Sequence, residues 1–210
     1  MRLERKSKMK EVKIKMSFYD KKETYDIPST SGYYKFEDGD NVFRILGAFS
    51  EKTAIQGLEY WKTEGNKRSP IRLRKNKDGT FPNVPVDQLE LNKFGQLDFP
   101  KYFWALPVWN YQEKKVQILE ITQKTILKNI QKFIENVKWG DPREYDFIVT
   151  KGKEGDKTIY TVTNNPKEKL EADIIPTYKG MDINMDVLFT GGDPFAGIST
   201  EDIDSEAVES

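Results

Sequence analysis

The chain has 210 residues, contains neither Cys nor His, and carries 34 basic and 34 acidic residues, for a net charge of zero. The missing Cys and His exclude disulfides, thiolate nucleophiles, imidazole bases and zinc sites built from those residues. The length fits one domain with extensions, and no segment approaches the roughly 18 consecutive apolar residues of a membrane-spanning helix.

The N-terminal residues 1–30 are predicted to form a flexible basic arm. Residues 1–15 contain seven basic and two acidic residues, which fits either an arm that lies along phosphates or a solubilising terminus. No apolar run follows this charge, so we expect no signal peptide and a soluble intracellular protein. A linker-like Pro-Ser-Thr-Ser-Gly occupies 28–32, and the folded domain is predicted to span 31–178.

This domain is predicted to be mainly β. Runs rich in β-branched and aromatic residues indicate strands at 41–46, 57–62, 71–74, 102–111, 116–121, 145–150 and 157–162. The last two alternate polar and apolar residues, as expected of a hairpin with one wet face. A helix is predicted between the fifth and sixth strands, capped by Thr122 and ended by Gly140, with Ile126, Ile130 and Val137 on its apolar face.

The order of these elements predicts an OB-fold-like Greek-key barrel with one helix. An OB-fold is a five-stranded barrel that commonly carries a helix between its third and fourth strands, and other small β-barrels share this order. The connection at 64–100 is rich in Gly, Pro, Asn and Lys. Connections this long inside a compact domain are usually functional, and we expect this one to fold over the sheet as a flap.

Aromatic and basic residues occur together along the predicted strands, which is the combination that single-stranded nucleic acid requires. Bases stack on flat rings, and phosphates bind Lys or Arg. The rings expected to stack bases are Tyr60, Trp61, Trp104, Trp109 and Tyr111. The cations expected to contact phosphates are Arg44, Lys62, Arg68, Arg72, Arg74 and Lys101.

Each ring also has a structural alternative. Successive side chains of a strand point to opposite faces, so the strand at 102–111 is expected to turn one of two ring-bearing faces outward, and its sequence leaves open which. Trp104 or Trp109, taken alone, is more often a core residue. Neighbouring residues of a strand do not both point inward, so one of Tyr60 and Trp61 is expected to be exposed.

The cations have alternatives as well. Arg44 lies within an apolar strand, where it is either a phosphate ligand or a partner for an acid. Arg72 and Arg74 share one face of their strand, and we expect both to be exposed, either toward phosphates or as an ordinary solvated face.

Residues 179–210 are predicted to form a disordered acidic tail. No basic residue follows Lys179, whereas residues 180–210 carry eight acids, so residues 1–179 have a net charge of +8. A basic body with an acidic end is typical of a protein that binds a polyanion and carries an internal competitor for it, and the alternative is a solubilising end. The residues expected to dock on a partner are Asp193, Phe195, Glu201, Asp202 and Asp204.

Signatures of catalysis are absent from the sequence. It contains no phosphate-binding glycine loop, no dinucleotide fingerprint and no nucleophile elbow. Most Asp residues lie in turn-like contexts, where they hydrogen-bond the backbone. We therefore expect no enzymatic activity, no cofactor and no metal site, and a carboxylate-held Mg²⁺ is the alternative that the sequence leaves open.

Several short segments carry a family resemblance between Tyr33 and Leu170. They are Tyr33-Tyr34-Lys35-Phe36, Asn41-x-Phe43-Arg44-Ile45-Leu46, Tyr60-Trp61, Phe103-Trp104-Ala105-x-x-Val108-Trp109-Asn110-Tyr111, Gln117-Ile118-Leu119-Glu120-Ile121 and Trp139-Gly140-Asp141-Pro142. In this order they resemble the single-stranded-DNA-binding proteins of tailed bacteriophages. The resemblance implies an OB-fold that coats DNA. The acidic end is similar to that of bacterial single-strand binders in its Asp-Pro-Phe, but Phe195 stands fifteen residues before the end of the chain.

We therefore expect a sequence-independent binder of single-stranded DNA that acts in phage DNA replication, recombination and repair in the host cell cytoplasm. Its acidic tail is expected to recruit replication and recombination proteins. We expect no membrane partner and leave a homo-oligomer open. The alternatives are an RNA-binding OB protein and a protein-interaction OB module, such as an adaptor or inhibitor whose acidic segment mimics DNA.

Overall fold

The computed structural model describes residues 32–196. The predicted basic arm at 1–30 lies outside the described residues, as do residues 197–210 of the predicted tail. The elements in chain order are β1 (Gly39–Ile45), η1 (Phe49–Glu51), β2 (Ile55–Glu64), β3 (Lys67–Leu73), η2 (Val86–Gln88), β4 (Lys101–Asn110), β5 (Lys115–Ile121), α1 (Lys124–Glu135), η3 (Pro142–Glu144), β6 (Asp146–Glu154), β7 (Lys157–Asn164), α2 (Ile174–Gly180) and η4 (Met185–Phe189).

The described residues are mainly β, as the sequence predicts. The strands form one antiparallel sheet in the order β3-β2-β4-β1-β6-β7, and β5 pairs with the free side of β4. Among residues 32–196 no strand pairing joins the ends of this order, so the sheet does not close into a complete barrel. No helix in this part of the chain is long and apolar enough to cross a membrane.

β4 is the strand around which the sheet is organised. On one edge, its first half pairs with β2 and its last residues pair with β1, while β5 pairs along the other edge. The ladder to β5 passes through Pro107, which lies opposite Ile118, without a change of register. A bulge at Pro107 is therefore absent, and side chains alternate regularly along the whole strand.

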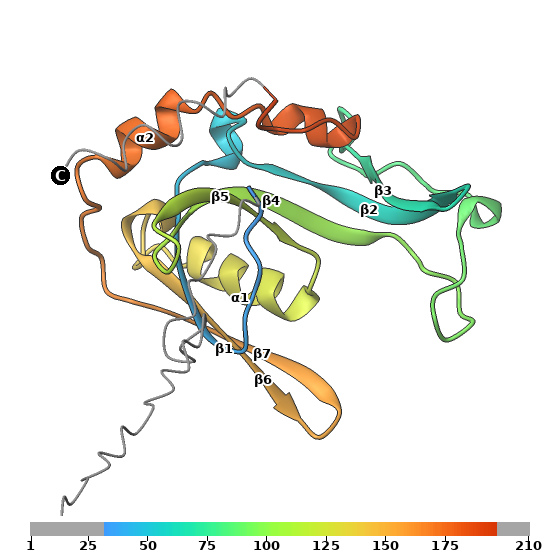
Figure 1. The fold of residues 1–210 in the computed structure, drawn as a ribbon, viewed down its shortest axis with the longest axis horizontal. Helices are drawn as coiled ribbons and strands as arrows, with labels where there is room; N and C mark the ends of the chain where they lie inside the picture. Colours follow the sequence, from blue (N-terminus) through green and yellow to red (C-terminus); the bar gives the residue numbers. More distant parts are fainter. Residues whose placement is uncertain (1–31, 197–210) are drawn as a thin grey trace, which may run out of the picture. The chain divides into compact units, whose positions relative to one another are not determined.

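α1 covers the main core and lies beneath β4 and β5 in Figure 1. Ile126, Leu127 and Ile130 are buried in this core. The helix is shorter than predicted, because it begins at Lys124 without a side-chain cap and ends at Glu135. Val137 lies beyond that end and is 92% exposed, so its place in the apolar periodicity was coincidental.

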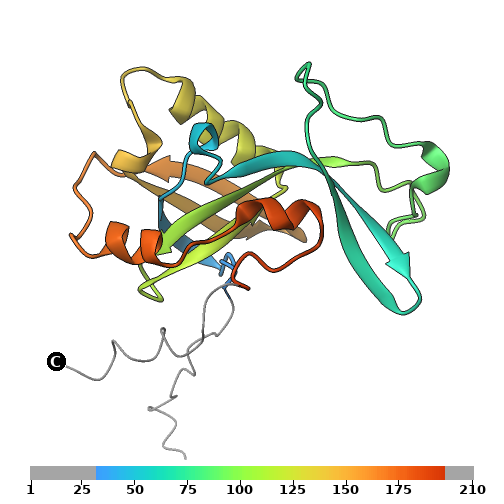
Figure 2. The same cartoon turned by 90° about the horizontal axis from the view of Figure 1, so that it is seen from above.

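The expectation of disorder from about residue 180 is wrong for residues 180–196. α2 and η4 belong to a C-terminal segment, residues 174–196, that runs across the outer side of β4 and β5 (Figures 1 and 2). Met185 and Leu188 are buried against Phe103, Ala105 and Ile118. Apolar side chains placed among the acids therefore anchor this segment. The prediction of disorder considered only the charge of these residues and did not include the anchoring.

The C-terminal segment also covers one face of β4, although one of the two faces was predicted to be exposed. Its even-numbered residues Leu106 and Val108 fill the main core, and its odd-numbered residues Phe103 and Ala105 contact the C-terminal segment. From Phe103 onward both faces of the strand are thus covered, and the prediction that one face turns two rings outward is wrong for this part of β4. Only Lys101 and Tyr102, at its beginning, are exposed.

A buried ion pair joins β1 to β6 inside this body. Arg44 Nε lies 2.6 Å from Asp146 Oδ1, and the two side chains are only 2% and 9% exposed. Arg44 Nη1 donates to the carbonyl oxygen of Glu168 at 3.0 Å, and Tyr111 Oη donates to Asp146 Oδ1 at 2.7 Å. Burial, followed by this hydrogen bond to a carboxylate, raises the pKa of Tyr111.

We predict that Arg44→Met lowers the free energy of unfolding by about 3–5 kcal/mol, because it leaves the Asp146 carboxylate buried without its cation. Urea denaturation checks this value. The matched control is Arg68→Met, since Arg68 is 48% exposed in its ion pair with Asp98, and exposed pairs contribute about 1 kcal/mol or less. Equal losses in the two variants would contradict the assignment.

Candidate nucleic-acid interface

The structure first removes several predicted residues from the surface. Arg44 is 1% exposed and Tyr60 is 8% exposed, so neither is placed to contact a phosphate or a base. The open alternative for Arg44, a partner for an acid, is the arrangement found. One of Tyr60 and Trp61 was expected to be exposed, and Trp61 is the less buried of the two, although it is half-buried.

The other predicted rings take part in packing. Trp104 packs against the main core and contacts Phe49 edge-on, with the ring centroids 5.2 Å apart. Trp109 packs against the small cluster around Leu46 and Ile174. Tyr111 is held by its hydrogen bond to Asp146. Trp104, Trp109 and Tyr111 are therefore each held by neighbours within the protein, and all three remain half-buried.

The Arg72 side chain is also buried, which corrects the expectation that it is exposed. Its side chain is 7% exposed, and it binds Glu59 Oε2 through Nε at 3.0 Å and Glu120 Oε2 through Nη2 at 2.8 Å. Its guanidinium carbon lies 5.2 Å from the centre of the Phe103 ring. Two carboxylates thus share one buried guanidinium on the outer side of the sheet.

Arg74 is exposed, but the C-terminal segment occupies it. Its Nη1 lies 3.0 Å from Asp186 Oδ1, its Nη2 donates to the Asp186 carbonyl oxygen at 3.2 Å, and its Cζ lies 4.0 Å from the centre of the Phe189 ring. An acid and a ring from η4 hold this cation in the way that a phosphate and a base would.

The predicted residues that remain accessible gather on one projection of the molecule. β2 pairs with β4 only as far as Glu59, and from Tyr60 onward it pairs with β3 alone. We call residues 60–71 the β2–β3 arm and the connection 74–100 the lobe. In Figures 1 and 2 both extend together away from α1 and the rest of the sheet. Lys62, Arg68 and Lys101 are exposed there, beside Trp61.

Sequence reasoning missed most rings of this region. Tyr102, Phe99 and Phe94 are 62%, 60% and 75% exposed, and Phe81 contacts Tyr102 with the ring centroids 5.3 Å apart. Three of these rings belong to the connection at 64–100, which the sequence flagged as functional without naming a ring in it. Large apolar rings in a segment without strand or helix periodicity were the signal that could have identified them.

Basic side chains stand against three of the rings. Arg68 Cζ lies 5.5 Å from the centre of the Trp61 ring, Lys75 Nζ lies 5.4 Å from that of Phe81, and Lys93 Nζ lies 5.0 Å from that of Phe94. Residues 60–102 carry nine basic and five acidic residues. The projection is therefore cationic and aromatic at the same points.

The lobe contains two turns with the same backbone geometry. In both turns the first Asn N–H donates to the carbonyl oxygen four residues later, and the Gly N–H donates back to the Asn carbonyl oxygen. The turns are Asn76-Lys77-Asp78-Gly79-Thr80 and Asn92-Lys93-Phe94-Gly95-Gln96. Gly79 and Gly95 have φ of +84° and +74°, where a side chain would be strained. Each turn therefore presents a Lys at its tip.

The lobe is fastened to the β2–β3 arm at the base of the second turn. The Glu90 carboxylate accepts hydrogen bonds from the backbone N–H and the hydroxyl of Thr63, and these bonds lower the pKa of Glu90. Asp98 binds Arg68 at 3.2 Å and Lys101 at 2.8 Å. The arm and the lobe are thereby joined by hydrogen bonds and ion pairs.

The residues predicted to dock on a partner divide into two groups. Phe195 packs edge-on against Tyr33, with the ring centroids 6.4 Å apart, and Asp193 accepts the backbone N–H of Phe195. Phe195 is therefore already used as an internal anchor. Glu201, Asp202 and Asp204 lie outside the described residues.

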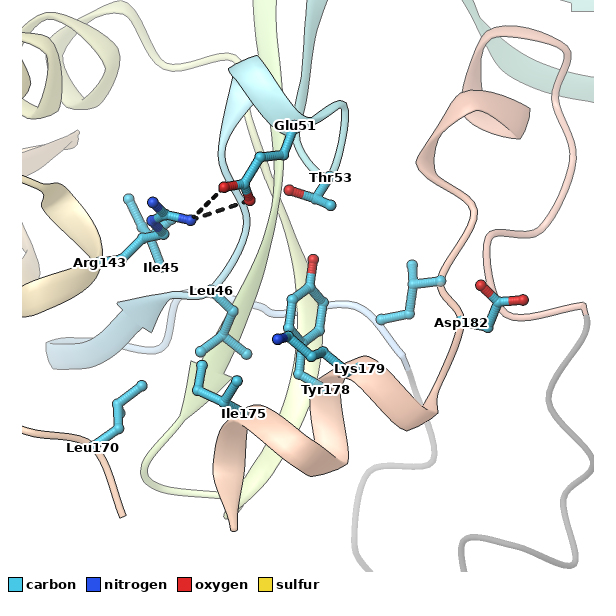
Figure 3. A pocket seen from close by; sticks show the side chains of 11 residues that line it. Ile45, Leu46, Glu51, Thr53, Arg143, Leu170, Ile175, Tyr178, Lys179 and Asp182 are labelled. Carbon is cyan, nitrogen blue, oxygen red and sulfur yellow. Dashed lines mark hydrogen bonds and ion pairs between the residues drawn. The ribbon is translucent and has the colours of Figure 1, made fainter. Parts of the chain in front are cut away.

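A pocket of about 480 Å³ lies between α2 and the segment that follows β1. Leu46, Leu170 and Ile175 supply apolar lining, and Figure 3 shows Arg143 at the rim, bound by both carboxylate oxygens of Glu51. Hydrogen bonds from Arg143 to Asp141, followed by those to Glu51, raise the pKa of Arg143.

Residues 32–196 contain no group of three or more His, Cys, Asp or Glu side chains placed to hold a metal ion. Neither a scan against protein-family models nor a search among curated proteins finds a match to this chain. The chemistry of the β2–β3 arm and the lobe therefore carries the functional argument.

The Glu59–Arg72–Glu120 cluster yields a stability prediction. Burial raises the pKa of Glu120, whose Oε1 is buried without a hydrogen-bond partner among the described residues. A carboxyl with a raised folded-state pKa stabilises the fold while it is protonated, and this contribution is lost as the pH rises through that pKa. We predict that the free energy of unfolding of Glu120→Gln, relative to that of the parent protein, increases as the pH rises from acidic to neutral. Urea denaturation at several pH values measures this difference.

The matched control is Glu59→Gln, which replaces the carboxylate that binds Arg72 Nε. We expect this change to lower the free energy of unfolding at neutral pH, because Glu59 is itself buried and bonded to the guanidinium. A larger loss for Glu120→Gln than for Glu59→Gln would show that Glu120 is a stabilising ion-pair partner instead.

Proposed function

We propose that this protein is a non-catalytic, sequence-independent binder of single-stranded DNA, and that the β2–β3 arm and the lobe form its binding surface. The observation that carries the proposal is the pairing of rings with cations at Trp61 and Phe81, which are half-buried, and at Phe94, which is exposed. A single strand alternates flat bases with phosphates, so a surface that alternates rings with cations matches it without reading sequence.

Tyr102 and Phe99 extend this surface at the root of the arm. Both rings are more than half exposed, and Lys101 and Arg68 lie nearby through their shared partner Asp98. Each base stacked on a ring contributes about 1–3 kcal/mol. Because duplex DNA keeps its bases stacked on each other, this contribution is available only from unpaired strands.

The antiparallel body supports the proposal at the level of fold. A helix that follows five strands and precedes a terminal hairpin is compatible with an OB-fold-like barrel, in which loops and hairpins commonly hold the nucleic acid. The resemblance to phage single-stranded-DNA-binding proteins points the same way, toward replication, recombination and repair in a host cell cytoplasm.

Acidic residues are proposed to compete with DNA at two places in the chain. Within the described chain, Asp186 and Phe189 occupy Arg74. Beyond it, residues 201–209 contain five acids and no base, and we propose that Glu201, Asp202 and Asp204 compete with DNA for the arm and recruit replication and recombination proteins.

A protein partner on the lobe is the second candidate function. Val86 and Leu91 are 60% and 63% exposed, and aliphatic side chains provide no face for a base. An apolar surface of this kind fits a protein-interaction module. The two functions separate in a gel shift with single-stranded DNA, because a protein-interaction module would not retard it, and competition with a matched RNA oligomer tests the RNA-binding alternative.

We predict that the protein binds fluorescently labelled oligo-dT with an affinity that falls as salt rises, with a slope of about −0.7 per phosphate contact. Tyr102→Ala is expected to weaken binding about 5- to 150-fold, the equivalent of about 1–3 kcal/mol for one stacked base. Titrations at several salt concentrations measure both effects.

Two further variants control this experiment. Tyr102→Phe keeps the ring and is expected to bind as the parent does. Val137→Ala removes a fully accessible apolar side chain outside the arm and the lobe, and no effect is expected. Binding that is absent at low salt, or independent of salt, would refute the proposed function.

The acidic end generates a separate prediction. Ending the chain after Ala196 removes five acids and leaves the packed C-terminal segment intact. We expect tighter binding to oligo-dT at low salt and a difference that disappears at high salt, since screening weakens competition between charges. The same result is expected when the five acids are replaced by Asn and Gln. Unchanged affinity at low salt would argue against competition.

A further inference from the structure

We propose that Phe94 is a wedge that inserts between bases where a single strand meets duplex DNA, so that the protein opens the end of a duplex as well as coating the freed strand. This inference rests on the proposed function, and it assigns to one turn of the lobe an activity that strand binding alone does not require.

The exposure of Phe94 is the first observation. At 75% it is the largest exposed fraction of any aromatic side chain in residues 32–196. Phe94 occupies the third position of the turn formed by residues 92–96, which is the tip of a short hairpin. A ring at a tip can enter a gap between two bases from outside, whereas a ring lying on a surface can only accept a base from one side.

The rigidity of this hairpin is the second observation. Asn92 Oδ1 accepts the backbone N–H groups of Phe94 at 2.9 Å and Gln96 at 3.1 Å. Leu91 pairs with Leu97, and the N–H of Asp98 donates to the Glu90 carbonyl oxygen at 2.8 Å. A wedge must resist the restacking of the bases that it separates, and these hydrogen bonds keep the tip from folding back.

The hairpin is also braced from below. Glu90 at its base is hydrogen-bonded to Thr63 of β2, and Asp98 at its other end is paired with Arg68 of β3 and with Lys101 of β4. Force on Phe94 is therefore transmitted to three strands. The same brace places the tip next to the cationic arm, which is the surface proposed to hold the strand once it is free.

Lys93 gives the tip a charge that suits the DNA backbone. Its Nζ lies 5.0 Å from the centre of the Phe94 ring, so a cation accompanies the ring toward the phosphates that flank the separated bases. Unstacking a base step is costly, and architectural proteins offset this cost with an apolar wedge that stacks on the exposed base and with contacts to the bent or opened backbone.

The lobe contains an internal comparison for this inference. The turn at residues 76–80 has the same backbone hydrogen bonds and the same Lys at its second position, but Asp78 stands where the other turn has Phe94. Asp78 Oδ1 accepts hydrogen bonds from the backbone and the hydroxyl of Thr80, so it stabilises its own turn. One turn is thus closed by a local acid, and the other is left with an outward ring.

The test uses the full chain and a forked duplex that carries a fluorophore and a quencher at the junction. With saturating protein, we expect the parent to separate the two labels and Phe94→Ala to slow opening by about tenfold. Phe94→Trp is expected to retain opening because it keeps a flat ring. Asp78→Ala, the matched change in the other turn, is expected to open the fork as the parent does.

Oligo-dT titrations of the same proteins separate this inference from the proposed function. Phe94→Ala should lower the oligo-dT affinity by a smaller factor than it lowers the opening rate, because the other rings of the arm and the lobe remain to stack bases. Loss of opening and of oligo-dT affinity in equal measure would make Phe94 a stacking surface and overturn the wedge, and so would opening at the parent rate. A parent protein that binds oligo-dT but leaves the fork closed refutes the wedge alone, whereas a parent that fails to bind oligo-dT refutes the proposed function.

Discussion

Burial of β4 on both faces is the constraint on which the rest of this structure depends. A strand that is hydrogen-bonded along both edges can still offer one face to a ligand. Here one face contributes Leu106 and Val108 to the main core, and the other receives Met185 and Leu188 from the C-terminal segment. Burying apolar area on both sides stabilises the body, and it leaves Trp104 and Trp109 only partly exposed.

Burial also determines the partners of the charged side chains in the body. A guanidinium near the covered faces cannot stay unpaired, because burial of a lone charge is very costly. Arg44 therefore pairs with Asp146, and Arg72 is shared by Glu59 and Glu120. Among the predicted phosphate ligands, Lys62 and Arg68 are exposed where β2 and β3 run past the body. There, and in the lobe, cations lie against rings that the C-terminal segment does not cover.

Much of the architecture could be predicted from the sequence, since it depends on local patterns. Each strand predicted from its β-branched and aromatic content is present, although the strand predicted at 71–74 proves to be the end of β3 (Lys67–Leu73), paired with β2. The buried face of α1 follows the spacing of Ile126 and Ile130. The position of the proposed binding region was also indicated by an unusually long connection. The exposed rings of this region could not be predicted, because a segment without periodicity gives no rule for which side chains point outward.

What the sequence determined by itself is the mainly β fold, the concentration of acids at the C-terminal end, and the presence of enough rings and cations for a polyanion surface. Each of these depends on composition or on neighbours within a few residues. Only the tertiary structure decided which rings are accessible, because that depends on a covering segment about 80 residues away along the chain, whose few apolar side chains outweigh its many acids. A contact between residues so distant produces no periodic pattern in the sequence of either segment. The exposure of the rings therefore follows only from the tertiary structure.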